Sequence, residues 1–460
     1  MEMKQQQFTG NNKLLLGIVL GVITFWLFAQ SLLNLVPTIQ HSFSSSIGTT
    51  SIAISITALF SGMFVVGAGS FADKLGRVKM TYIGLILSII GSLLIIVTPF
   101  TPMLILGRII QGLSAAAIMP STLAIIKTYY QGSDRQRALS FWSIGSWGGS
   151  GFASLFGGMI DTAIGWRWIY IISIIVAILA ILLIKGTPET KANQTTNTKF
   201  DFVGLTLFVI MMLSINVVIT QSAKLGLFSP TILALIAVFI ISTIIFVRVE
   251  MKMHYPLIDF KLFNNKAYTS ATVSNFLLNG VAGTLIVANT FVQQGLGFST
   301  FQTGLLSITY LITVLLMIRV GEKVLQKVGA RKPMLLGTAL NMVGILLISF
   351  TFLSSQMYVV VCVIGYLLYG LGLGFYATPS TDTAISNSPE DKVGVASGIY
   401  KMASSLGGAF GIALSGTLYG IGAAMVNINF GAMLGLWLNI LMAIISFTVI
   451  LIGVPKQQSK

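Results

Sequence analysis

Side chains able to bind or release protons are scarce in this chain and lie far apart in the sequence. Only 12 of the 460 residues are Asp or Glu, and there are two His and one Cys. The single thiol, Cys362, excludes a disulfide within the chain, and no metal-ligand spacing occurs. The phosphate-binding sequence Gly-x-x-x-x-Gly-Lys-Ser/Thr is also missing, so ATP coupling within the chain is not expected. The sequence predicts no catalytic residues, no metal and no bound cofactor.

Two carboxylates lie within apolar stretches or at their ends. Asp382 falls in YATPSTDTAISN, one to two turns before the expected end of a stretch, and Glu322 lies at the end of another. An ionisable residue embedded in a membrane span is a functional candidate by default. We interpret both as proton-coupling residues; the alternative for Asp382 is a solvated carboxylate at a helix end. Lys401 is either a partner or a lysine that snorkels to the surface.

Arg108 lies inside a third apolar stretch, LILGRIIQGLSAAA. A cation at the centre of a membrane span costs about 2.5–3.5 kcal/mol on insertion scales, so it should face a cavity or a partner. The alternative is an arginine that snorkels to the membrane interface.

The composition places these residues in a membrane protein. Hydrophobic residues make up 55% of the chain and charged residues 8%, which is about a third of the charged share of a soluble domain. The net charge of +15 comes from Lys and Arg clustered at the ends of apolar runs. This pattern is typical of membrane topology. We therefore expect a lipid bilayer, and no nucleic acid, as partner.

The apolar runs predict an all-α polytopic protein with 14 transmembrane helices, because a spanning helix needs about 20 mainly apolar residues. Alternate loops hold nearly all Lys and Arg, and the opposite loops carry little beyond Arg167 and Lys224. This asymmetry predicts that both termini are cytoplasmic. The predicted spans are 14–36, 48–72, 80–98, 102–127, 138–161, 166–184, 202–220, 228–249, 269–293, 303–325, 333–353, 357–385, 394–420 and 431–454.

Two polar stretches divide the predicted helices into groups of six, two and six. They are KGTPETKANQTTNTKFD, from Lys185, and EMKMHYPLIDFKLFNNKAY, from Glu250. The sequence GEKVLQKVGARK repeats GSFADKLGRVK in degraded form, which supports two related halves. The predicted parts are a cytoplasmic N-terminus (1–13), an N-terminal six-helix bundle (14–184), a linker with two inserted helices (185–268), a C-terminal six-helix bundle (269–454) and a cytoplasmic tail (455–460).

The sequence GSFADKLGRVK between the second and third spans resembles the loop signature of the major facilitator superfamily of transporters. Its matching positions are Gly69, Asp73, Gly76 and Arg77. In that family this loop latches the two halves together and is broken and remade during alternating access. The carboxylate is placed to accept hydrogen bonds from helix N-terminal amides or to pair with the arginine. The other interpretation is ordinary topology charge.

The six, two, six order resembles the 14-helix drug:proton antiporter branch of this family, as does the pattern from Pro256 to Lys266. That segment also fits an amphipathic stretch at the membrane interface. Arg-x-x-Gln-Gly at Arg108 resembles the motif of span 4 that is linked in the family to proton transfer.

The sequence GSWGGSGFASLFGG, residues 145–158, resembles the antiport motif of span 5. Small residues at this spacing allow close helix approach and bending. The branch carries Gly-Pro in the middle of this motif, where Ala153 and Ser154 stand here. The matching positions are Gly149, Gly157 and Gly158.

Aromatic and amide side chains in spans 1 and 9 and their neighbours predict a substrate cavity. Such side chains without fixed counter-charges suit bulky, planar, amphiphilic molecules, cations included. Ordinary helix packing is the alternative for any single residue. The candidates are Trp26, Gln30, Asn34, Asn275, Asn279, Asn289 and Tyr310.

The resemblance implies a proton-coupled multidrug efflux transporter that exports fluoroquinolones and other amphiphilic drugs by alternating access. Drugs and protons would be its ligands and the proton gradient its energy source, and it would not be an enzyme. We expect a monomer in a bacterial cell membrane. The alternative, which the altered motif of span 5 keeps open, is a carrier of a lipid, peptide or osmolyte, working as a symporter.

Overall fold

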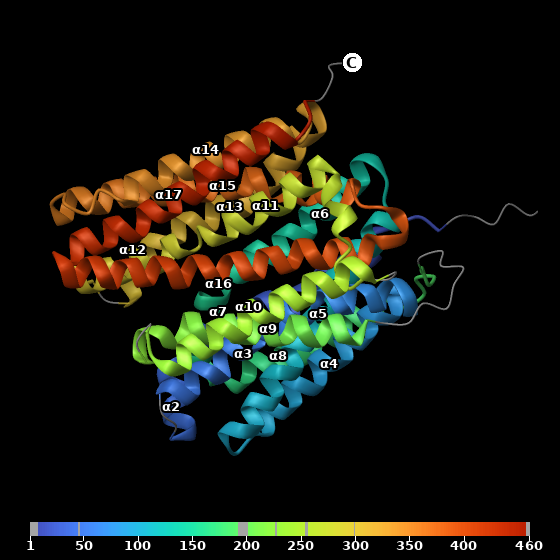
Figure 1. The fold of residues 1–460 in the computed structure, drawn as a ribbon, viewed down its shortest axis with the longest axis horizontal. Coiled ribbons are helices and arrows are strands. Elements are labelled where there is room, and N and C mark those ends of the chain that lie inside the picture. Colours follow the sequence, from blue (N-terminus) through green and yellow to red (C-terminus); the bar gives the residue numbers. More distant parts are fainter. Residues whose placement is uncertain are drawn as a thin grey trace, which may run out of the picture. The chain divides into compact units, whose positions relative to one another are not determined.

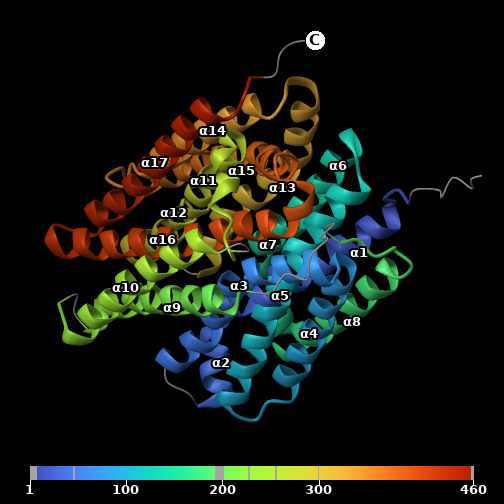
Figure 2. The same cartoon turned by 45° about the vertical axis from the view of Figure 1, so that its right-hand side comes forward.

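The computed structural model describes residues 8–44, 47–191, 201–225, 228–253, 256–298 and 300–456, and regular structure in these ranges is helical (Figures 1 and 2). The chain divides into two units. Unit 1 comprises Met1–Thr195 and Ser388–Gly398, and unit 2 comprises Thr196–Asn387 and Ile399–Lys460. The inserted helices thus group with unit 2. The boundaries expected for the two six-helix bundles and the linker between them stay a prediction.

Within the described ranges, 11 helices are long and apolar enough to cross a membrane. Three further apolar helices are shorter: Asn12–Phe28, Leu155–Ile164 and Phe202–Ile215. An all-helical membrane protein is therefore what the structure supports, and the count of 14 is not settled by helix length. Two of the shorter helices lie in predicted spans 1 and 5, where π-helical turns interrupt the α-helix.

Unit 1 is built around helix α5. Both α3 and α4 pack along α5, and α8 packs against α1 and α4. Glycine makes the closest approach possible, because a Cβ atom on Gly112 would come within 2.8 Å of the Phe60 Cβ atom of α3. The helices are α1 (Asn12–Ile23), the π turn η1 (Thr24–Phe28), the 3-10 turn η2 (Ala29–Asn34), α2 (Val36–Phe43), α3 (Ile47–Leu75), α4 (Arg77–Val97), α5 (Thr101–Tyr129), α6 (Gly132–Ser143), the π turn η3 (Ile144–Gly148), α7 (Gly149–Ile164) and α8 (Arg167–Ile184).

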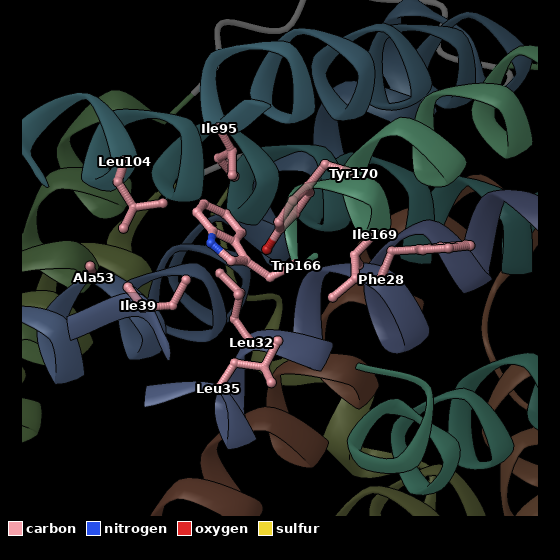
Figure 3. Close-up of a cluster of buried hydrophobic side chains, with 10 residues drawn as sticks. All are labelled: Phe28, Leu32, Leu35, Ile39, Ala53, Ile95, Leu104, Trp166, Ile169 and Tyr170. Atoms are coloured by element: carbon pink, nitrogen blue, oxygen red, sulfur yellow. The ribbon is translucent and has the colours of Figure 1, made fainter. Parts of the chain in front are cut away.

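A buried apolar cluster fixes the irregular part of span 1 in unit 1. Figure 3 shows the Trp166 indole in the middle of this cluster, beside Tyr170 of α8. The Trp166 Nε1–H donates to Ser42 Oγ at 3.2 Å, so its polar atom is satisfied. Side chains from seven helical segments meet here, and they hold α2 and η2 against α8. The members are Phe28, Leu32, Leu35, Ile39, Ala53, Ile95, Leu104, Trp166, Ile169 and Tyr170.

Unit 2 repeats the packing of unit 1. Helices α13 and α14 pack along α15, as α3 and α4 pack along α5. Predicted span 9 is broken in two near Gly280 and Gly283, and α9 lies beside α10 in both views (Figures 1 and 2). The helices are α9 (Phe202–Leu225), α10 (Pro230–Lys252), the 3-10 turn η4 (Phe260–Asn264), α11 (Lys266–Gly280), α12 (Gly283–Leu296), α13 (Thr300–Val328), α14 (Arg331–Ile348), α15 (Ser355–Ser386), the 3-10 turn η5 (Glu390–Lys392), α16 (Val393–Met425) and α17 (Ile428–Gly453).

The central helices α5 and α15 contain the same tripeptide near their ends. Pro-Ser-Thr begins at Pro120 in α5 and at Pro379 in α15. The next residue is Leu123 in one helix and Asp382 in the other. This correspondence supports the two related halves predicted from the sequence, and it shows that only one half holds an acid at this place.

Candidate functional site

A buried ion pair lies at the junction of α3 and α4. Gly76, with φ of 127°, joins the two helices in a conformation that favours glycine. The Asp73 Oδ1 atom accepts hydrogen bonds from Arg77 Nε at 3.1 Å and from Arg77 Nη2 at 3.0 Å. Asp73 is 2% exposed and Arg77 4%. Both charges are thus removed from water, and each depends on the other for neutralisation.

The Arg77 guanidinium also reaches three other segments of unit 1. Its Nη1 atom donates to Thr128 Oγ1 of α5 at 2.9 Å and to Thr190 Oγ1 at 3.5 Å. Its Nη2 atom donates to the Glu390 carbonyl oxygen of η5 at 3.0 Å. Arg77, the first residue of α4, therefore ties the α3–α4 junction to α5, to the stretch after α8 and to the stretch before α16.

The second oxygen of Asp73 holds the start of α16. Asp73 Oδ2 accepts a hydrogen bond from the Val395 amide at 3.2 Å. A helix N-terminus favours an anion, because its first amides have no intrahelical acceptor. Gly69 permits this contact, since a Cβ atom there would overlap with the Gly394 carbonyl oxygen. Both contacts considered for Asp73, the arginine and the helix amide, are thus made at once.

Glu189 is a member of this cluster that sequence reasoning missed. Its carboxylate accepts hydrogen bonds from the Val78 and Lys79 amides, each at 2.9 Å, and so caps the N-terminus of α4. The Thr190 carbonyl oxygen accepts from the Arg77 amide at 3.0 Å. Glu189 lies in the polar stretch that begins at Lys185. No motif or hydrophobic periodicity in that stretch distinguishes it as a functional residue.

Arg108 lies in the interior of unit 1. It is 0% exposed, so the interpretation as a snorkelling arginine is wrong. Nη1 donates to the Ala29 carbonyl oxygen at 2.6 Å and to Gln111 Oε1 at 3.1 Å, and Nε donates to the Ala53 carbonyl oxygen at 3.2 Å. Ala29 follows the π turn Thr24–Phe28, where the helical hydrogen bonds change partners. Arg108 thus joins α5 to the irregular part of span 1 and to α3.

The glycines of the predicted antiport motif lie along the contact between α7 and span 1. A Cβ atom on Gly149 would come within 3.0 Å of the Trp26 Cβ atom, and one on Gly157 within 2.8 Å of the Ser31 carbonyl oxygen. Gly158 has nothing within 4 Å of that position. The π turn Ile144–Gly148 lies at the start of this motif.

The predicted cavity residues of unit 1 are described only in part. Trp26 is half-buried, and its ring packs edge-on against Phe25. Gln30 and Asn34 belong to η2, but their side chains lie outside what the structure describes.

In unit 2, the predicted cavity residues join neighbouring helices. Asn275 Nδ2 of α11 donates to the Tyr400 carbonyl oxygen at 2.9 Å and to Ser404 Oγ at 2.6 Å. Asn279 Nδ2 donates to Asn275 Oδ1 at 2.9 Å. For Asn275 and Asn279 these contacts favour helix packing over a free binding role.

The other two candidates of unit 2 contact tyrosines of α15. Asn289 Oδ1 accepts from the Tyr366 hydroxyl at 3.0 Å. The Tyr310 ring packs against Tyr369 with centroids 5.3 Å apart.

The two predicted proton-coupling acids have different surroundings. Asp382 is 7% exposed, so a solvated carboxylate does not describe it, and its Oδ1 atom accepts from Ser386 Oγ at 3.1 Å. Glu322 is 3% exposed and forms an ion pair with Arg319. It also accepts from Gln326 Nε2 at 3.1 Å.

A chain of hydroxyl groups in unit 2 was missed by sequence reasoning. The Tyr376 hydroxyl is 2.7 Å from Ser274 Oγ and 2.8 Å from Ser380 Oγ. Ser380 Oγ is 3.0 Å from the Tyr400 hydroxyl. The chain links α11, α15 and α16 next to Lys401, which is 4% exposed. Serine and tyrosine are ordinary residues in any helix, so only their spatial arrangement reveals this network.

Comparison with known proteins places these features in context. Residues 18–412 and again 268–460 match the Major Facilitator Superfamily. Over 453 residues, which are 98% of each chain, the protein is 64% identical to "Quinolone resistance protein NorB" of Staphylococcus aureus (strain MRSA252).

Solved structures of low sequence identity have the same fold. A double-tryptophan mutant of XylE superposes with a TM-score of 0.69 at 16% identity, covering 97% of this chain and 96% of that one. The human organic anion transporter MFSD10 (TETRAN) superposes with a TM-score of 0.65 at 14% identity, covering 95% and 98%.

Proposed function

Because the chain belongs to the major facilitator superfamily, it is a membrane transporter and not an enzyme, and we propose that it exports quinolones and other amphiphilic drugs in exchange for protons. The observation that carries this proposal is the 64% identity, over 98% of both chains, to a quinolone resistance protein. A likeness of that extent covers every span, so it includes the parts that bind substrate as well as those that set the fold.

We propose 14 spans in a bacterial cell membrane, with both termini cytoplasmic and the chain acting as a monomer. The three shorter apolar helices overlap predicted spans 1, 5 and 7, and each of the 11 longer ones matches another predicted span. The alternation of basic and nearly uncharged loops supports the orientation. Reporter fusions at both ends test it, and an extracellular signal at either end would contradict it.

The Asp73 cluster suits a latch for alternating access. It binds the first residues of α16 to α3 through one carboxylate, one arginine and a backbone contact between glycines. The rest of α16 belongs to unit 2. We propose that these bonds break and re-form in each cycle, with Gly69, Asp73, Gly76 and Arg77 as the gating residues.

Proton coupling is assigned to Asp382, with Glu322 as the second candidate and Arg108 as a positioning residue. Asp382 is a buried acid in α15, the helix that also contributes Tyr376 and Ser380 to a chain of hydroxyl groups, and a buried carboxylate in a membrane span is a functional candidate. Arg108 positions the irregular part of span 1, where Trp26, Gln30 and Asn34 would meet the drug. In unit 2, Asn289, Tyr310, Asn275 and Asn279 are proposed as residues that contact the drug.

Purified protein in liposomes tests the proposal. Norfloxacin should move when only a pH gradient is imposed, and Asp382→Asn should abolish this movement while leaving exchange of labelled for unlabelled norfloxacin. Asp134→Asn is the matched control, because Asp134 is exposed on α6 and should behave as wild type. A rate of norfloxacin transport that is the same with and without the pH gradient would refute proton exchange. Counterflow of a lipid, peptide or osmolyte without any counterflow of norfloxacin would instead assign the chain to another solute.

A further inference from the structure

Two buried acids that have no role in the proposals above meet at one end of the inserted helix pair. Asp201 immediately precedes α9 and is 5% exposed, and Glu250 lies in the last turn of α10 and is 2% exposed. Asp201 Oδ1 accepts a hydrogen bond from the Gly204 amide at 2.7 Å and so caps α9. Glu250 Oε2 accepts from the Ile258 amide at 2.9 Å. One oxygen of each carboxyl group is thus used in fixing the backbone.

The other two oxygens face each other. Asp201 Oδ2 and Glu250 Oε1 are both buried, and no donor reaches either of them among the described residues. Both lie against Gly204, where a Cβ atom would overlap with each. Each of the two oxygens is 2.2 Å from the position of that Cβ atom, so they are at most 4.4 Å apart. Ionised carboxylates only accept hydrogen bonds, and two of them so close in a desolvated place repel strongly. A single proton between them removes both difficulties.

We propose that Asp201 and Glu250 form a proton-binding site, in which one shared proton joins the two carboxyl groups and closes this end of the inserted helix pair. The site fastens the start of α9, the end of α10 and the segment before η4 to one another. It does not depend on the transported substrate or on the acids proposed for coupling.

The basic groups of α10 face away from the pair. Arg248 and Lys252 are exposed two residues before and after the buried Glu250. Asp259 accepts a hydrogen bond from the Lys261 amide at 3.0 Å, within η4. Lys199 and His254 lie outside the described residues. Within the described part of the chain, neutralisation therefore falls to the proton itself.

Thermal unfolding of the detergent-purified full chain, followed from about pH 5 to about pH 8, tests the proposal. Raising the pH should destabilise the wild type, because the folded state holds a proton that the unfolded chain releases. For one such proton the unfolding constant rises roughly tenfold per pH unit between the pKa of the carboxyl groups in the unfolded chain and that of the folded pair, and the slope ends above the latter. Asp201→Asn and Glu250→Gln should each fold and lose this slope, since an amide N–H takes the place of the proton. Asp134→Asn should keep the wild-type slope, because Asp134 is exposed.

A second measurement reads the proton directly. The infrared difference spectrum of wild type minus Glu250→Gln should contain the C=O stretch of a protonated carboxylic acid. Three results would overturn the proposal: the missing band, an unchanged pH slope in both amide variants, or failure of both variants to fold. Stabilisation of the wild type by Na⁺, Mg²⁺ or Ca²⁺ that both amide variants lose would assign the site to a cation instead, and would equally overturn it.

Discussion

Replacing Asp73 with Asn should release the start of α16. The substitution removes the negative charge and leaves one oxygen to serve both Arg77 and the Val395 amide, which now bind separate oxygens at 3.0–3.2 Å. Removing one partner of a buried ion pair costs about 3–5 kcal/mol. Arg77 keeps Thr128 and the Glu390 carbonyl oxygen as acceptors, so we expect the lower end, about 3 kcal/mol, which is a shift of about 150-fold in the opening equilibrium.

Amide hydrogen exchange of residues 393–398, read by mass spectrometry, measures this opening. Val395 lies in the first turn of α16, where an amide lacks an intrahelical acceptor, so its protection depends on Asp73. Exchange in Asp73→Asn should accelerate by about 150-fold. Glu189→Gln is the matched control. It removes a charge from the same cluster but contacts only the α4 amides, so the expected cost is about 0.3–1 kcal/mol. Equal exchange in both variants, or none above wild type in Asp73→Asn, would refute the latch.

Three further substitutions have defined outcomes. Gly69→Ala places a Cβ atom against the Gly394 carbonyl oxygen, which should cost about 1–3 kcal/mol and speed exchange at 393–398, whereas Gly158→Ala, with open space, should match wild type. Arg108→Lys keeps the charge but loses the planar guanidinium that reaches Ala29, Ala53 and Gln111. Transport of norfloxacin driven by a pH gradient in liposomes should therefore fall at least about tenfold in folded protein. Full transport activity would contradict the positioning role. Gly411→Ala drives a Cβ atom into the Gly280 backbone of α11, so the thermal midpoint should fall, while Gly416→Ala should leave it unchanged.

The sequence predicted the features that depend on length and local pattern. Helix α15 runs over Ser355–Ser386 where span 12 was expected at 357–385, because a continuous apolar run has few ways to satisfy its backbone in lipid other than a helix. The junction at Gly76 was also recognisable, since the glycine, the acid and the arginine lie within nine residues of one another.

Features that depend on close approach in space could not be predicted. Hydropathy is the same for an α-helix and for a π turn, so η1 and η3 were read as parts of regular spans. Glu189 was passed over because it lies 110 or more residues from the amides it caps. Asn275 is a polar residue in an apolar span, and only its bonds to Tyr400 and Ser404 distinguish a packing role from a binding role.

The touching glycines Gly69 and Gly394 have a kinetic consequence. Closing a contact between two backbones orders no rotamers, so it carries no side-chain entropy cost. The attraction comes instead from the charges around Asp73, whose energy changes steeply over short separations in a desolvated place. We therefore expect this junction to close readily. It should open only when the charged contacts around Asp73 break together.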